Sequence, residues 1–263
     1  MKRSLLACAL VIAALGVAAQ AQTTATTPYD HVHLSAPDPD KAYAWYVANL
    51  DGQQGENAGR VIFETFAGKR PLPVELIWIK ADGAQPSEGG VIDSIGFSVP
   101  DVDAKVKTLV AAGATMKDKS TVVDPSGVKI ELVNDARQRG LHHITLRVAD
   151  PKATLDWFSQ NFGGARVKMN GRDALQYGNT YLVVLQGAGT APSQGRAIDH
   201  LGFAPASIDA TVAALRTHDG KISAEPAPKP NQFGHRTGYV EAPGGIRIEL
   251  VEHTNCAWGK TPE

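Results

Sequence analysis

The stretch DHVHLSAPD (30–38) sets a pattern that returns three more times along the chain, as DSIGFSVPD (93–101), HHITLRVAD (142–150) and DHLGFAPAS (199–207). The second position of these stretches is held by His31, Ser94, His143 and His200. An imidazole in an otherwise apolar strand is costly to bury without a partner, and a metal ion would account for the three histidines together. Because recurring patterns decide the architecture of a chain, the four stretches predict four similar structural units of about sixty residues.

Each stretch predicts a strand that leads into a helix. In the first stretch, apolar and polar residues alternate with a period of two, which is typical of a strand. A helix is expected over about residues 38–50, since Asp38 can cap it and Pro39 suits its first turn. The corresponding capping positions of the other units are Asp101, Asp150 and Ser207.

The last strand of a unit is also recognisable. Two units close with a turn rich in Pro and Gly followed by an alternating strand, in residues 124–133 (DPSGVKIELV) and 242–251 (APGGIRIELV). Glu131 and Glu249 occupy the same place in these two strands. The first unit ends in PVELIWIK (73–80) and offers Glu75 at a similar place, whereas the third unit offers no acid there.

This arrangement resembles the vicinal oxygen chelate superfamily, which includes glyoxalase I, bleomycin- and fosfomycin-resistance proteins and extradiol dioxygenases. The resemblance implies an α+β fold in which four βαβββ modules pair into two cupped, mixed β-sheet domains. It also implies that a histidine of the first strand and a glutamate of the last strand of a module bind a metal. With neighbouring modules paired, the expected domains are residues 22–138 (modules one and two) and 139–263 (modules three and four).

Pairing modules three and four would bring together His143, His200 and Glu249. Two imidazoles and one carboxylate suit non-haem iron, so Fe(II) is the expected divalent metal, although Mn, Ni or Zn accept the same ligands. The resemblance then implies an extradiol-type dioxygenase that acts on a small aromatic diol, with Tyr239 hydrogen-bonded to the substrate. His235 is the candidate general acid or base, and its spacing from Tyr239 departs from the pattern of that family.

Pairing modules one and four, as in fused four-module glyoxalases, would instead gather His31, Glu75, His200 and Glu249. That set resembles the metal site of glyoxalase I, where a ligand carboxylate moves a proton. We favour neighbour pairing because it uses the better-matched motifs, and it leaves a degenerate site in the N-terminal half, where the hydroxyl of Ser94 is a poor ligand. A non-catalytic protein that binds a small molecule, as resistance proteins do, is the third hypothesis.

Histidines outside the shared position are expected to be structural. His33 follows His31 by two residues and therefore lies on the same face of the strand. We expect His33 to support a ligand rather than to bind the metal itself. His142 should point away from that face.

The N-terminus predicts a cleavable export signal over residues 1–21. A basic start, an apolar run at positions 5–19 and small residues at positions 19 and 21 are typical of such signals, and the run is short for a membrane span. The expected location is therefore periplasmic or secreted. The formal net charge is −1 without a block of like charge, so we expect a small-molecule substrate and no nucleic acid or membrane partner. Either a monomer or a homodimer is compatible with the sequence.

Overall fold

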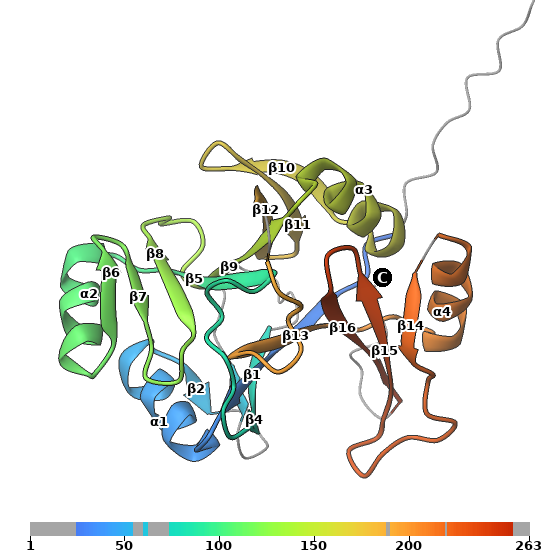
Figure 1. Ribbon diagram of the computed structural model, residues 1–263, viewed down its shortest axis with the longest axis horizontal. Coiled ribbons are helices and arrows are strands. Elements are labelled where there is room, and N and C mark those ends of the chain that lie inside the picture. Colours follow the sequence, from blue (N-terminus) through green and yellow to red (C-terminus); the bar gives the residue numbers. More distant parts are fainter. Residues whose placement is uncertain (1–24, 55–59, 63–73, 188–189, 219, 255–263) are drawn as a thin grey trace, which may run out of the picture.

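The computed structural model describes residues 25–54, 60–62, 74–187, 190–218 and 220–254 (Figure 1). In this part of the chain, the order strand, helix, strand, strand, strand occurs four times, which confirms the predicted α+β fold of four βαβββ modules. The expected signal at residues 1–21 lies outside the described residues. Among the described residues, no helix has the length and apolar character needed to cross a membrane.

The first two modules fill the N-terminal half of the chain. Module one consists of β1 (Tyr29–Ala36), α1 (Pro39–Asn49), β2 (Gln53–Gln54), β3 (Arg60–Ile62) and β4 (Glu75–Lys80). Module two consists of β5 (Ile92–Ser98), α2 (Val102–Ala111), β6 (Thr115–Asp118), β7 (Thr121–Val123) and β8 (Lys129–Val133).

The other two modules follow without a long connection. Module three consists of β9 (Gly140–Val148), α3 (Pro151–Phe162), β10 (Ala165–Met169), β11 (Arg172–Tyr177) and β12 (Thr180–Gln186). Module four consists of β13 (Ile198–Phe203), α4 (Ile208–Thr217), β14 (Lys221–Ala224), β15 (His235–Ala242) and β16 (Ile246–His253).

Each helix begins at the residue that the sequence predicts as its cap. The carboxylates of Asp38, Asp101 and Asp150 accept a hydrogen bond from the backbone N–H three residues later, at 3.2, 2.9 and 2.9 Å. The hydroxyl of Ser207 accepts the same bond at 3.3 Å. These bonds satisfy N–H groups that have no partner within the helix, so the end of each opening strand also determines where its helix starts.

Each sheet combines one module from each of the two predicted domains. The strand orders are β14-β15-β16-β13-β1-β4-β3-β2 and β10-β11-β12-β9-β5-β8-β7-β6. Modules one and four share the first sheet, in which β1 is antiparallel to β13, and modules two and three share the second, in which β5 is antiparallel to β9. The prediction that neighbouring modules pair within residues 22–138 and 139–263 is therefore wrong.

The connections between the two sheets contact each other in this pairing. The chain crosses between the sheets from β4 to β5 and again from β12 to β13, and the two crossings run side by side. The N–H of Gln85 donates to the carbonyl of Gly195 at 3.2 Å, and the N–H of Ala197 donates to the carbonyl of Gln85 at 2.7 Å. The sequence of an opening strand does not indicate this distant contact, because such an apolar strand can pair with the opening strand of any of the other three modules.

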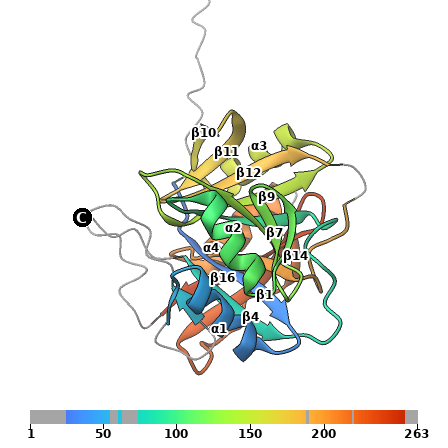
Figure 2. The same cartoon turned by 90° about the vertical axis from the view of Figure 1, so that its left-hand side faces the viewer.

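Modules one and two, which follow each other in the chain but belong to different sheets, meet through their helices. The indole of Trp45 in α1 donates to the carbonyl of Ala112 after α2 at 2.8 Å, and Lys105 of α2 donates to the carbonyl of Asn49 at 2.9 Å. Figure 2 shows α1 and α2 together on the side that faces the viewer. A single hydrophobic cluster runs through all four modules, so the two sheets share one core.

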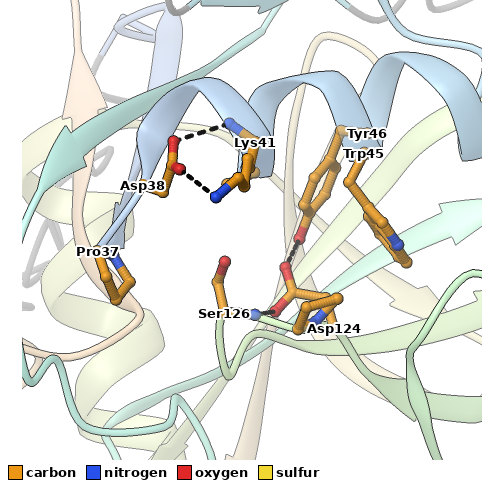
Figure 3. A pocket seen from close by; sticks show the side chains of 9 residues that line it. Pro37, Asp38, Lys41, Trp45, Tyr46, Asp124 and Ser126 are labelled. Atoms are coloured by element: carbon orange, nitrogen blue, oxygen red, sulfur yellow. Dashed lines mark hydrogen bonds and ion pairs between the residues drawn. The ribbon is translucent and has the colours of Figure 1, made fainter.

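A buried hydrogen bond also joins α1 to the turn before β8. Tyr46 donates its hydroxyl to Asp124 Oδ2 at 2.8 Å, and the backbone N–H groups of Ser126 and Val128 donate to Asp124 Oδ1 at 2.8 Å each. Tyr46, Asp124 and Ser126 border a pocket of about 340 Å³ between the helix and the turn (Figure 3). Burial raises the pKa of the Asp124 carboxyl to about 6, although the hydrogen bonds that it accepts act in the opposite direction.

This raised pKa predicts how stability changes with pH. The folded state holds the Asp124 proton more tightly than the unfolded state, where the pKa is near 3.8, so the stabilisation is complete below about pH 4 and is lost as the pH rises through about 6. The difference in the free energy of unfolding between Asp124→Asn and the wild type should therefore shift in favour of the variant by roughly 2–3 kcal/mol as the pH rises from about 4 to 6.5. Urea unfolding at a series of pH values measures this difference.

The Tyr46→Phe variant serves as the matched control. It removes a hydrogen bond that lowers the pKa of Asp124, so the pH-dependent loss of stability should move to higher pH. A difference between Asp124→Asn and wild type that stays constant with pH would contradict the assignment.

Candidate metal centre

Histidines from β1 and β13 meet in the middle of the first sheet. In the antiparallel register, His31 is opposite Gly202 and His33 is opposite His200. Side chains alternate along a strand, so His31 and His33 share one face, and their ring centroids lie 4.8 Å apart. A Cβ atom at Gly202 would lie 2.2 Å from His31 Cε1, so only glycine leaves room for this imidazole.

Glu249 of β16 completes the cluster. β16 is parallel to β13 and places Glu249 beside Gly202. Glu249 Oε2 lies 3.1 Å from His200 Nε2 and 3.3 Å from His31 Nε2. Together with His33, these side chains offer four ligand atoms that all lie within 4.8 Å of one another. Three imidazoles and one carboxylate are a donor set that divalent transition metals such as Zn, Ni, Co and Fe accept.

A buried nitrogen atom in the cluster fits a metal site. His33 Nδ1 is buried and makes no hydrogen bond to the residues that the structure describes, and His31 Nε2 contacts only Glu249 among them, at 3.3 Å. Buried polar atoms normally have partners, and an imidazole nitrogen with a lone pair directed at a shared point is ready to bind a metal. The residues present therefore fit a divalent ion.

Aspartates directly before the two opening histidines fix the orientation of the rings. Asp30 Oδ2 lies 2.7 Å from His31 Nδ1, and Asp199 Oδ1 lies 2.6 Å from His200 Nδ1. When Nδ1 donates to a carboxylate, Nε2 keeps its lone pair for a metal. Arg247 holds the second of these carboxylates through an ion pair of 2.7 Å with Asp199.

The charges of the cluster depend strongly on one another. Burial lowers the pKa of His31, but Asp30 and Glu249 beside it outweigh burial and raise that pKa to about 9. Burial raises the pKa of Glu249, but hydrogen bonds from His200 and His31 hold it below its usual range. Burial and the charges of the other two histidines lower the pKa of His33 to about 2. A proton on His31 thus balances the carboxylates, and a bound metal would replace that charge.

His143 lies outside this cluster, so the predicted ligand set of His143, His200 and Glu249 is wrong. His143 belongs to β9 in the second sheet, because module three pairs with module two instead of module four. There its ring lies over Gly96, where a Cβ would come within 2.0 Å of His143 Cε1. The opening motif correctly predicts a buried strand histidine but not which sheet it enters.

The second sheet surrounds its half-buried glutamate with protein groups. Glu131 of β8 lies 3.5 Å from His143 Nε2. It accepts hydrogen bonds from Arg172 at 3.0 Å, from Thr145 at 2.9 Å and from the hydroxyl of Ser94. The guanidinium of Arg172 brings a positive charge to Glu131, as a metal would to Glu249. Ser94 stands where the first sheet has His200, as expected for a degenerate site.

The structure brings together three of the four residues of the alternative, glyoxalase-like ligand set. His31, His200 and Glu249 converge, whereas Glu75 lies beside His31 in the parallel register of β1 and β4 and is not part of the four-residue cluster. His33 joins the cluster instead, and its two-residue spacing from His31 was the sequence signal for this. The Asp-His pairs that open two of the four stretches are the sequence signal for Asp30 and Asp199, two residues that are not among the predicted site residues.

Tyr239 and His235 both lie on β15 at this site. Tyr239 is opposite Glu249, and its ring meets His200 edge to face with centroids 5.5 Å apart. Burial and the charge of Glu249 raise the pKa of Tyr239, so its hydroxyl keeps its proton and is able to donate a hydrogen bond. His235 and Phe233 line the pocket of about 440 Å³ that leads to the cluster.

Comparisons with known proteins agree with this architecture. Residues 140–250 match the model of the Glyoxalase/Bleomycin resistance protein/Dioxygenase superfamily, which confirms the predicted resemblance. Glyoxalase I from Zea mays is similar over 87% of this chain and 93% of its own, with 18% identity and a TM-score of 0.65. A Bacillus subtilis protein provisionally named a dioxygenase is similar over 90% of this chain and 91% of its own, with 15% identity and a TM-score of 0.56. At these identities the likeness shows a shared fold. No curated protein sequence matches the chain.

The cluster predicts one metal site per chain, in the first sheet. Glu249→Gln and His200→Ala should each weaken Zn²⁺ binding by about 100-fold or more, because each removes a ligand. His143→Ala should leave the affinity and the stoichiometry unchanged, because that ring lies in the second sheet. Titration calorimetry of metal-free protein measures both quantities, and loss of zinc binding in His143→Ala but not in His200→Ala would show the site to be misplaced.

Proposed function

We propose that this protein is a metal-dependent isomerase or lyase of the glyoxalase type. The observation that supports the proposal is the convergence of His31, His200 and Glu249, since His31 and Glu249 also line a pocket built by modules one and four. A glyoxalase-type site requires this module pairing, whereas a dioxygenase site with His143 requires the other. The proposed substrate is a small molecule with two neighbouring oxygen atoms, such as a hemithioacetal of a ketoaldehyde.

The metal would supply Lewis acidity that makes the carbon–hydrogen bond beside a bound oxygen more acidic. The remaining work falls to residues of the chain. Glu75 occupies the register position beside His31, and we assign it the transfer of the carbon-bound proton from one substrate carbon to the next. Tyr239 lies opposite Glu249 in the register of β15 and β16, and we assign it the orientation of this carboxylate.

The pocket positions the substrate and limits access of water. Ile77 and Val251 form apolar parts of its lining, and Phe233 stands at its mouth with 51% of its surface exposed. His235 lines the same pocket and is the proposed proton donor or acceptor for the end of the substrate far from the metal.

A ring-cleaving dioxygenase is the second candidate. His31, His200 and Glu249 by themselves form a two-histidine, one-carboxylate set, which suits Fe(II) and leaves positions for a diol and oxygen. In this case Tyr239 would contact a small aromatic diol, and the proposed metal is Fe(II) instead of Zn, Ni, Co or Mn.

Two assays, one without oxygen and one with oxygen, separate these candidates. Protein loaded with Ni²⁺ or Zn²⁺ should convert the hemithioacetal of methylglyoxal and a small thiol, followed by NMR, and Glu249→Gln should lower kcat by about 10²-fold or more. The His143→Ala variant should keep full activity. Oxygen uptake with catechol and Fe(II), without conversion of the hemithioacetal, would replace the first candidate by the second. Metal-dependent ligand binding without turnover of either compound would identify a binding protein.

We further propose that residues 1–21 direct export and are removed, with the mature chain in the periplasm or outside the cell. The basic start, the apolar run and the small residues at positions 19 and 21 support this. The full-length chain produced in a Gram-negative bacterial host should appear in the periplasmic fraction with Gln22 at its N-terminus, as read by mass spectrometry. A cytosolic protein that keeps residues 1–21 would contradict the proposal.

A further inference from the structure

The two aspartates that orient the metal ligands are themselves held in different ways. Asp199 is paired with Arg247 at 2.7 Å and accepts a hydrogen bond from the backbone N–H of Gly195 at 2.7 Å. Neither of these partners links Asp199 to another histidine. Asp30 Oδ1 instead lies 2.8 Å from Nε2 of His253, the last residue of β16. An imidazole has a second nitrogen, so the contacts of Asp30 continue beyond His253.

The next group in this chain is His235. His235 and His253 face each other where β15 and β16 meet, and His253 Nδ1 lies 3.3 Å from His235 Nε2. The backbone N–H of His235 donates to Asn231 Oδ1 at 3.1 Å, and the hydroxyl of Thr254 donates to the carbonyl of Gly234 at 2.6 Å, so the turn that carries His235 is firmly held. Because His235 lines the pocket, the chain that starts at the ligand His31 returns to the same cavity.

Hydrogen-bond chemistry fixes the direction of every bond along this chain. An ionised carboxylate only accepts, so Asp30 requires an N–H from Nδ1 of His31 and another from Nε2 of His253. Neutral His253 then has its lone pair on Nδ1, which accepts the Nε2–H of His235. One carboxylate thus sets which nitrogen carries the hydrogen in all three rings.

We propose that His253 is a positioning residue that links the metal ligand to the pocket histidine. Through Asp30 it holds His31 with Nε2 directed at the metal, and through its other nitrogen it holds His235 in one tautomer toward the substrate. This inference rests on the proposed metal site but not on the identity of the reaction.

Two substitutions at His253 separate hydrogen bonding from packing. Phenylalanine keeps a ring but makes no hydrogen bond, whereas the amide of glutamine is able to donate to Asp30 and to accept from His235. His253→Phe should weaken binding of Co²⁺, followed by its visible absorption, by about 10- to 100-fold, and His253→Gln should stay within about threefold of wild type. His218→Phe, at a histidine paired with Asn161 between α3 and α4, is the control and should bind Co²⁺ as wild type does.

A second measurement reports on His235 without metal. In protein with ¹⁵N-labelled histidine, NMR should show His235 with its hydrogen on Nε2 in wild type and His253→Gln, and a mixture of tautomers in His253→Phe. Neither measurement needs turnover, so both stand whether or not the hemithioacetal or the diol is converted. Should His253→Phe fail to fold, Asp30→Asn tests the same chain and should weaken Co²⁺ binding to a similar degree.

The proposal has two ways to fail. Wild-type cobalt affinity and an unchanged His235 tautomer in His253→Phe would show that the chain positions nothing. Equal weakening in His253→Phe and His253→Gln would show that His253 acts through packing alone, which also overturns the proposal.

Discussion

The antiparallel contact between β1 and β13 is the interaction on which the rest of the molecule depends. It joins the first module to the last and places His31 and His33 against His200. Two of the four clustered donors come from each of these modules, so neither module holds the site alone. Gly202 allows the strands to come together at this point, because any side chain there would collide with the ring of His31.

Local signals in the sequence predict most of the fold. Helix caps, Pro-Gly turns and strand alternation act over a few residues, so they predict the four modules, and they place His200 and Glu249 in the site for either pairing. They do not predict the pairing, which involves contacts between segments far apart in the sequence, such as β1 with β13 and Gln85 with Gly195. For the same reason they do not separate His143 from His31, since a strand histidine has the same neighbours in sequence whether its ring meets a metal or a glutamate.

The two sheets solve one physical problem in two ways. Each withdraws a glutamate on the last strand of a module from solvent, Glu249 fully and Glu131 in part, and such a carboxylate needs a compensating positive charge. At Glu131 this charge is built into the protein as Arg172, so the arrangement is complete without any bound ion. At Glu249 imidazoles take the place of the guanidinium, and these are the groups that exchange a proton for a metal.

Sharing one sheet between the first and last modules also sets the order in which the molecule can assemble. Modules two and three are adjacent in the chain and can close their sheet early, whereas β1 must wait for β13 and β16, which are synthesised last. The ligand cluster is therefore the final part to form. If residues 1–21 direct export as proposed, it forms only after translocation, and the metal content of the outer compartment, not of the cytosol, decides which ion is captured.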